Sequence, residues 1–496
     1  MIKLNIGIVF IGKPQWEAGW PYLGYNNETC IKLIKDYLEN SFPELMYIWY
    51  EILTNYNANL VKEIKNSIKD VDGVIIFTIG HYGDPGIVQA GIEIIESQKP
   101  VILTNLIYRG DHTFTKIFSS IKNKSFKILP ISIEKLEDLS ESIKILIKLL
   151  KLRGNKILVY APEKVKMNWQ RILELFNPER NRIRIKDPEF LEKVINLSSD
   201  QRFEFFTDIE GKDQAHQWRR DEDRYSRNLK EIFNIEMIKG NPEEIMDFYD
   251  NVDEEDANKI VEKWKEEALR VEPSENTLLN SAKLYIALKT LLSEKKFNIF
   301  TPDCGTFLLT GVLPAYPCMA FMELIKDNIY GICESDMDCT ISYLFGLYLT
   351  NRPGFVSNHT LDTSNNQITY MHCLAPNKLY GNTGPKSDYE ILYHGETHYL
   401  GASPCVKFPV GEYVTTIKIS ILNKKIALRK GKIIDNVVDK NGCVSKMLVE
   451  GNVSKIMDNY DWDTFGWHRV TFIGDWKNDF ITGAKLLGLK VIEEDI

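Results

Sequence analysis

The sequence lacks the short motifs that mark several large classes of protein. Its eight cysteines are spread from Cys30 to Cys443 without a CxxC pair, so neither a zinc ribbon nor a small disulfide scaffold is indicated. Reduced thiols in a cytoplasmic enzyme are the favoured interpretation. The sequence contains neither a GxGxxG motif nor a Walker loop, so a bound nucleotide is not indicated.

Long apolar runs and an excess of basic residues are also missing. No stretch reaches the roughly 18 consecutive apolar residues that cross a membrane. The N-terminal run MIKLNIGIVFIGKP is short for a signal peptide, contains Asn5 and lacks a small-residue cleavage site, so we expect a first buried strand there. The formal charge of −8 argues against nucleic acid as a partner, because neutralising phosphates needs a basic face. We therefore expect a cytoplasmic protein with neither a membrane nor a nucleic-acid partner.

The 496 residues are 44% apolar and 26% charged, which is typical of globular protein and sufficient for about three domains. In residues 1–152, short apolar strands such as NIGIVFIG and DGVIIFTIG alternate with segments that are apolar at helical spacing. This alternation predicts a parallel sheet covered on both faces. Ligands of such sheets bind at the carboxyl ends of the strands, where the loops carry Trp16 and His81.

Two further segments follow, each with its own pattern of apolar and polar residues. Residues 153–350 begin with the strand-like GNKILVYAPEK, continue through long charged helical segments and return to strands, which predicts a second α/β domain with extra helices. Residues 351–496 are rich in alternating and β-branched runs such as VTTIKISIL, and only their end returns to a helix and a strand. The predicted fold is therefore α/β, with two doubly wound domains followed by a β-rich domain that forms an antiparallel barrel or sandwich.

Three acidic residues precede an apolar helical segment in the middle of the chain. Glu334, Asp336 and Asp338 stand in GICESDMDCTISYLFGLYLT, and five of the eight histidines follow in the last third of the sequence. Acids at the start of a helix are stabilised by the helix dipole, so the cluster has a purely structural explanation. Buried carboxylates are costly unless a cation meets them, and carboxylates with imidazoles are typical ligands of a divalent metal.

At this point the chain resembles a known family. ESD, an apolar helix, LTNRPGFVSN, YMHC and WHRVTFIGDW follow in an order that resembles the C-terminal half of the L-fucose isomerase family and its L-arabinose isomerase relatives. The similarity is distant, and LPAYPC and GWHRVTF are shared with uncharacterised members. The resemblance implies two α/β domains before a β-rich domain, in agreement with the patterns of residues 1–152, 153–350 and 351–496. It also implies a homo-oligomer, either a trimer or a hexamer.

Enzymes of this family bind a divalent cation, typically Mn²⁺, through a glutamate, an aspartate and a histidine. The motifs place the glutamate at Glu334 and the histidine at His468, while Asn358 in FVSN takes the place of the aspartate. The amide oxygen of Asn358 can still coordinate a hard cation. Because the amide carries no charge and cannot act as a base, the resemblance implies weaker metal binding and the loss of one proton carrier.

The reaction implied by the resemblance is the interconversion of an aldose and a ketose through an enediol. This reaction needs a metal to polarise the carbonyl and hydroxyl groups and a base within reach of the carbon acid. Glu334 is the candidate base. Asp338, one helical turn beyond Glu334, and Asp362, four residues after Asn358, are the candidates for the missing proton carrier, whereas Asp336 faces away if the helix has already begun.

Five further residues are candidates for contacts with a sugar substrate. Asp303 in TPDCGTF ends a predicted strand, although a turn or cap role is the stronger alternative. His372 follows the family-like YMH pattern, and Trp467 could stack on a sugar ring; each could equally be a strand or core residue. Trp16 and His81 occupy loops at the sheet end, where relatives contact sugar from a neighbouring subunit.

The resemblance therefore implies a metal-dependent aldose–ketose isomerase acting on a small sugar such as a deoxyhexose or a pentose. One alternative is a family member that binds sugar or regulates without catalysis, since a fold alone does not establish activity. Another keeps the metal and catalyses epimerisation or dehydration, which also begin with proton abstraction beside a carbonyl.

Overall fold

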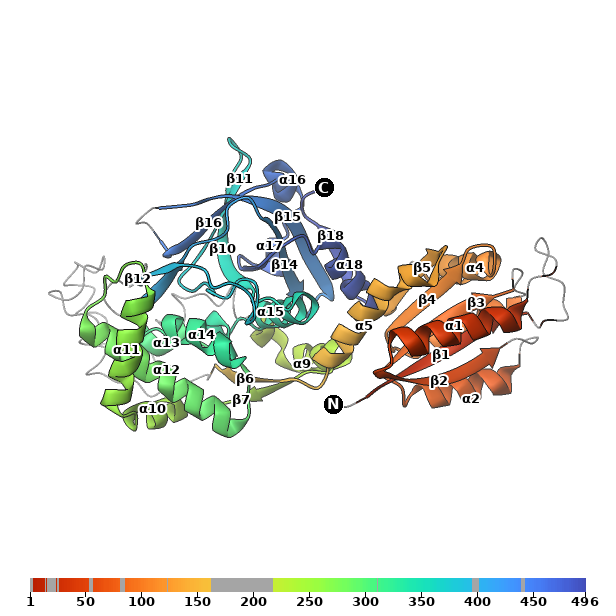
Figure 1. The fold of residues 1–496 in the computed structure, drawn as a ribbon, viewed down its shortest axis with the longest axis horizontal. Coiled ribbons are helices and arrows are strands. Elements are labelled where there is room, and N and C mark those ends of the chain that lie inside the picture. Colours follow the sequence, from red (N-terminus) through yellow and green to blue (C-terminus); the bar gives the residue numbers. More distant parts are fainter. Residues whose placement is uncertain are drawn as a thin grey trace. The chain divides into compact units, whose positions relative to one another are not determined.

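The computed structural model describes residues 3–13, 15, 24, 26–52, 57–80, 85–122, 124–161, 217–309, 311–394, 401–438 and 442–496. The chain divides into two compact units (Figure 1). The first contains Met1–Arg153 and Asn478–Val491, and the second contains Gly154–Lys477 and Ile492–Ile496. The division of the chain into three domains, with boundaries at residues 152/153 and 350/351, remains a prediction.

The first unit is built on a parallel sheet in the order β2-β1-β3-β4-β5. Its strands are β1 (Leu4–Gly12), β2 (Leu45–Ile52), β3 (Gly73–Ile79), β4 (Val101–Leu106) and β5 (Ile128–Ile133). The helices are α1 (Asn27–Ser41), α2 (Ala58–Ile68), α3 (Pro85–Ile95), α4 (Asp111–Ile121), α5 (Ser140–Leu152) after the short η1 (Leu136–Leu139), and α18 (Lys477–Leu486), most of which belongs to this unit. The alternation of apolar strands and amphipathic helices predicted this arrangement correctly.

The second unit begins with a smaller parallel sheet in the order β7-β6-β8-β9. Its strands are β6 (Lys156–Tyr160), β7 (Glu236–Lys239), β8 (Ile299–Pro302) and β9 (Tyr330–Gly331). The helical elements around it are η2 (Gln217–Asp221), α9 (Glu222–Phe233), α10 (Glu243–Asp250), α11 (Glu254–Glu267), α12 (Glu275–Lys295), α13 (Cys304–Leu309), α14 (Cys318–Leu324), η3 (Ile325–Asp327) and η4 (Cys333–Ser335). The prediction of two successive α/β folds, each built on a parallel sheet, is thus confirmed.

An antiparallel barrel completes the second unit. Strand pairing runs β14-β17-β10-β11-β16-β15 and closes because β14 also pairs with β15, while β18 (Lys490–Glu493) joins β15 as a further strand. The barrel strands are β10 (Phe355–Asp362), β11 (Gln367–His372), β14 (Tyr413–Ser420), β15 (Lys425–Asn436), β16 (Ser445–Glu450) and β17 (Arg469–Ile473). The hairpin of β12 (Tyr389–Tyr393) and β13 (Ala402–Val406) and the short helices α16 (Val453–Asp458) and α17 (Trp462–Phe465) accompany it. The barrel, rather than a sandwich, is the form that the predicted β-rich domain takes.

Helix α15 (Met337–Thr350) links the parallel sheet to the barrel (Figure 1). Nearly all of its side chains are buried, as its apolar sequence predicted. It packs against β14 and β17, and the close approach depends on Gly346, where an added Cβ would lie 2.0 Å from the ring of Phe472. The first turn of α15, with its acidic residues, is therefore fixed against the barrel.

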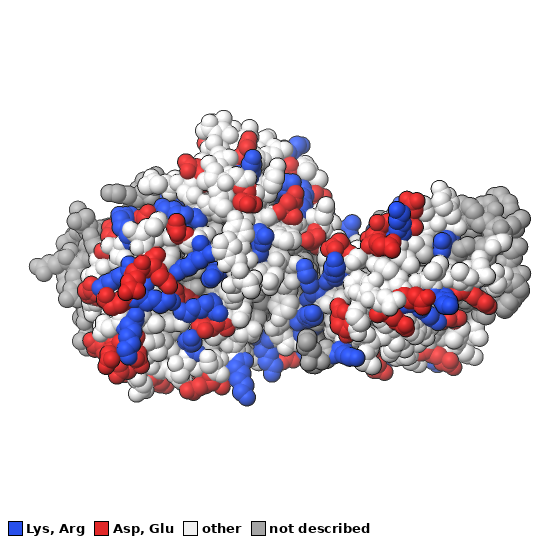
Figure 2. Space-filling model, in the orientation of Figure 1, with Lys and Arg blue, Asp and Glu red and all other residues white. Residues whose placement is uncertain are grey.

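Charged side chains of both signs are interspersed on the face shown in Figure 2. Along α11, for example, Lys259 pairs with Glu255 and Asp256, and all three side chains are mostly exposed. Such exposed pairs contribute little to stability. In the parts of the chain that the structure describes, every helix is too short or too polar to cross a bilayer.

Candidate metal centre

Glu334 is presented by an unusual turn between β9 and α15. Its backbone has φ 63° and that of Ser335 has φ 46°, both in the left-handed region that residues with a side chain seldom adopt. The indole of Trp218 donates a hydrogen bond to the carbonyl oxygen of Ser335 over 2.9 Å and helps to hold this turn. Helix α15 begins only at Met337, so Glu334 lies in the short η4 turn that follows β9 rather than on α15.

Two histidines from the barrel meet the carboxylate of Glu334. Nε2 of His372, at the end of β11, lies 3.3 Å from Oε1, and Nε2 of His468, just before β17, lies 3.4 Å from Oε2. Both histidines are buried, whereas the Glu334 side chain is 39% exposed, so the cluster has access to solvent through the glutamate. Burial would raise the pKa of Glu334, but the two histidines outweigh it and lower that pKa to about 2.

Asp336 holds the other nitrogen of His468. Its Oδ2 lies 3.1 Å from Nδ1 of His468 and accepts a hydrogen bond from Nζ of Lys418 over 2.7 Å. Its Oδ1 caps α15 by accepting from the backbone N–H of Cys339. Burial would raise the pKa of Asp336, but Lys418 and His468 hold it well below its usual range. Burial disfavours the charged form of Lys418, and Asp336 overcomes this and raises the pKa of the lysine.

These side chains form two overlapping groups of possible metal ligands. The first is Glu334, His372 and His468, and the second is Asp336, Cys339 and His468; within each group the ligand atoms lie within 4.8 Å of one another. The second group already contains a cation, because Nζ of Lys418 lies 3.0 Å from Sγ of Cys339 as well as 2.7 Å from Asp336. Burial and Asp336 also raise the pKa of Cys339 well above its usual value, which disfavours the thiolate that a metal needs. The first group is therefore the candidate metal centre.

Asn358 stands on β10, between the strands that lead to the two histidines. It pairs with Met371 on β11, and its neighbour Ser357 pairs with Arg469 on β17. Its Oδ1 is buried without a hydrogen-bond donor among the described residues. Asn358 therefore carries this amide oxygen on the strand that pairs with both β11, which ends at His372, and β17, which begins just after His468. Its role as a metal ligand remains a prediction.

Asp338 points into a different environment from Glu334. Its Oδ1 accepts hydrogen bonds from the hydroxyl of Tyr225 over 2.9 Å and from the backbone N–H of Ile421 over 3.2 Å. Burial raises its pKa to about 7, and the negative charge of Asp336 adds to the effect. Because α15 begins after Asp336, that residue is the helix cap and reaches His468, whereas Asp338 lies one step into the helix and ties it to α9 and the β14–β15 turn.

The other candidate site residues lie in several places. Asp362 is exposed at the end of β10, where its carboxylate accepts hydrogen bonds from the backbone N–H of Ser364 and the side-chain amide of Asn365. Asp303 is buried after β8 and accepts from the N–H of Thr306, as a helix cap does. Trp467 donates its indole N–H to the carbonyl oxygen of His359 over 2.8 Å. Trp16 and His81 lie outside the described residues.

The structure thus brings together Glu334, His468 and His372, of which the last was expected to contact substrate rather than metal. Lys418 was missed altogether. The sequence contains no signal for it, because Lys418 alternates with isoleucines in VTTIKISIL and so shares a strand face with Thr416 and Ser420, a pattern that predicts an exposed polar face. A buried lysine requires an acidic partner, but its pairing with Asp336 depends on the packing of α15 against β14.

No protein-family model matches this chain, and a search of curated proteins finds no match either.

Proposed function

We propose that this protein is a metal-dependent aldose–ketose isomerase related to the L-fucose isomerase and L-arabinose isomerase families, with a small aldose as its substrate. The observation that supports the proposal most directly is the meeting of Glu334, His372 and His468. Two of these three residues are the ones that the family motifs single out, and they come from positions more than 130 residues apart in the chain.

The chemistry of the donor set fits a divalent cation. The separations of 3.3 and 3.4 Å between Glu334 oxygens and histidine nitrogens are close to the roughly 3 Å expected for neighbouring ligands around one ion. Glu334 and Asp336 bring two negative charges, and Lys418 neutralises only one of them. One carboxylate and two imidazoles suit Mn²⁺, and they suit Fe²⁺, Co²⁺ and Zn²⁺ at least as well.

Each residue of the centre has a role in the proposed reaction. A bound metal would polarise the carbonyl group and the adjacent hydroxyl of the sugar and so acidify the C–H group of the carbon that bears the hydroxyl. The Glu334 carboxylate, ionised at neutral pH, accepts the proton from C2 at one of its Oε atoms and returns it to C1. The hydroxyl proton passes from the oxygen on C2 to the oxygen on C1, so the overall exchange balances. The buried imidazoles of His372 and His468 fix the orientation of that carboxylate.

A protein that binds sugar without turning it over is the second candidate. It is favoured by Asn358, whose amide cannot carry a proton where the related enzymes have an aspartate.

Calorimetry with Mn²⁺, Co²⁺ and Zn²⁺ tests the proposal, with an aldose panel assayed for ketose on the same samples. Wild type, Glu334→Gln and Asn358→Asp are compared with Asp475→Asn, a matched control that changes an exposed carboxylate on the same unit. We expect the wild type and the control to bind metal and form ketose, and Glu334→Gln to lose both.

Metal binding without ketose in the wild type, together with ketose formation by Asn358→Asp, would establish the second candidate instead. Failure of the wild type to bind any of the three ions would refute both the metal centre and the isomerase.

A further inference from the structure

A buried chain of contacts lies behind the candidate metal centre. Lys418 on β14 donates to Oδ2 of Asp336, and the same oxygen lies 3.1 Å from Nδ1 of His468. The side chains of these three residues are only 3%, 2% and 5% exposed. Water therefore has little access to these three side chains, and each of them depends on its neighbour for a hydrogen-bond partner.

Asp336 is held rigidly at both of its oxygens. Oδ1 is fixed at the start of α15 by the backbone N–H of Cys339 over 2.8 Å, and Oδ2 is fixed by the ammonium group of Lys418. The carboxylate therefore cannot rotate away from His468 without breaking the helix cap. The acid thereby forms a fixed support for the imidazole.

The contact decides which nitrogen of His468 carries a proton. An ionised carboxylate can only accept a hydrogen bond, so Nδ1 must be the donor. The ring then presents its other nitrogen, Nε2, to Glu334. A neutral imidazole with a proton on Nδ1 has a free lone pair on Nε2, which is the form that binds a metal ion.

We propose that Lys418 and Asp336 are positioning residues that hold His468 with Nδ1 protonated and Nε2 directed into the candidate metal centre. The proposal rests on the metal centre of the proposed function, but not on the identity of the sugar or on turnover. Lys418 balances the charge of Asp336 inside the protein, so the carboxylate can orient the histidine whether or not a metal ion is bound.

A merely structural ion pair would behave differently from a positioning pair. The unit offers a comparison in Asp461, which is more exposed (38% against 2%) but likewise caps a helix, α17, through the N–H of Thr464 and pairs with a lysine, Lys425, over 3.3 Å. In that second pair no histidine contact accompanies the aspartate among the described residues. Asp461→Asn therefore reproduces the loss of a capping carboxylate with a lysine partner, without a direct effect on His468.

The test measures Co²⁺ binding by calorimetry and the visible absorption of bound Co²⁺ in wild type, Asp336→Asn and Asp461→Asn. In Asp336→Asn the N–H of Cys339 retains the amide oxygen as its acceptor, so the NH2 group faces His468 and cannot accept from Nδ1. We expect a ten- to hundred-fold weaker affinity, as is typical when a partner behind a metal ligand is lost, and an altered Co²⁺ spectrum. Asp461→Asn should match the wild type in both.

The double variant Asp336→Asn with Lys418→Met removes the clash between the amide NH2 and the ammonium group, and it replaces Asp336→Asn if the single variant does not fold. In the wild type loaded with Zn²⁺, selective ¹⁵N labelling of histidine should show His468 protonated at Nδ1 and bound through Nε2. This measurement needs no variant at the pair.

Two results would overturn the proposal: folded variants that bind Co²⁺ within about twofold of the wild type, or His468 bound through Nδ1. Failure of the wild type to bind Co²⁺ or Zn²⁺ would instead remove the metal centre itself, so the two failures are distinguishable.

Discussion

The carboxyl group of Asp338 is a buried acid with a pKa raised to about 7, mainly by burial. In the unfolded chain an aspartate titrates near 3.9. Between these values the folded state holds a proton that the unfolded state releases, so the free energy of unfolding falls as pH rises from about 4 to about 7.

Asp338→Asn removes this titration and keeps an oxygen for Tyr225 and Ile421. We expect the wild type to lose on the order of 1.4 kcal/mol per pH unit relative to the variant across this range, measured by urea denaturation at pH 4.5, 5.5, 6.5 and 7.5. A difference that stays constant with pH would contradict the assigned protonation.

At the level of single residues, the sequence predicted the parts of the site whose chemistry is visible locally. Three acids before an apolar helix indicated a buried charged centre, whereas His468 was named only through the family resemblance of the WHRV segment. The role of Asp336 could not be predicted, because it depends on whether α15 begins before or after that residue. Lys418 and His372 could not be assigned because their partners are set by strand pairing and by the docking of α15, both of which join distant segments.

At the level of elements, the contact between α15 and β17 depends on the absence of a side chain at Gly346. Gly346→Ala should favour the helix by about 1 kcal/mol through propensity, but the new methyl group would collide with the ring of Phe472. Overpacking typically costs about 1–3 kcal/mol, so we expect net destabilisation and a weaker hold on the first turn of the helix.

A double-mutant cycle with Phe472→Leu measures this contact by urea denaturation. The smaller leucine should restore part of the stability that Gly346→Ala removes, so the double variant should be more stable than the sum of the two single changes predicts. Additive effects would show that the helix moves aside at no cost.

The elements themselves were largely predictable, for reasons specific to each type. Buried parallel strands such as Gly73–Ile79 are apolar at nearly every position, and amphipathic helices such as Ala58–Ile68 have a buried residue at every third or fourth position. The closure of the barrel was not predictable, because the pairing of β14 with both β15 and β17 leaves no local trace. A barrel and a sandwich have the same alternating pattern.

At the level of the whole molecule, the candidate metal centre lies entirely within the second unit. A ligand stabilises only the folded state that binds it, by about 2.7 kcal/mol at a hundred times its dissociation constant. In differential scanning calorimetry we expect added Co²⁺ or Zn²⁺ to raise the unfolding temperature of the second unit and to leave that of the first unchanged. Glu334→Gln should abolish the shift, and a shift of the first unit alone would place the metal elsewhere.

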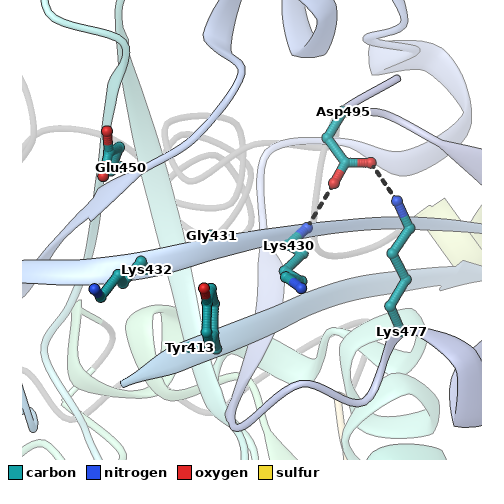
Figure 3. Close-up of a pocket in the computed structure, with 7 residues that line it drawn as sticks. All are labelled: Tyr413, Lys430, Gly431, Lys432, Glu450, Lys477 and Asp495. Atoms are coloured by element: carbon teal, nitrogen blue, oxygen red, sulfur yellow. Dashed lines mark hydrogen bonds and ion pairs between the residues drawn. The ribbon is translucent and has the colours of Figure 1, made fainter. Parts of the chain in front are cut away.

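The surface of the second unit also has a pocket of about 400 Å3 on the barrel, lined by Tyr413, Lys430, Gly431, Lys432, Glu450, Lys477 and Asp495 (Figure 3). Lys477 already pairs with Asp495 and Glu493, and Lys430 pairs with Asp475. None of its lining residues belongs to the metal centre, so variants such as Lys432→Ala should leave the Co²⁺-induced shift unchanged.

The division of the chain has a consequence for the order in which the protein is made. The first unit includes Asn478–Val491, where Gly488 lies against Lys127. Its two segments are therefore separated in the sequence by Gly154–Lys477. On the ribosome the residues of the metal centre, from Glu334 to His468, emerge before the first unit has received its final segment. The strands of the first unit are therefore all made long before α18 is available to pack with them, and a cut after Arg153 would separate the first unit from this part of its own structure.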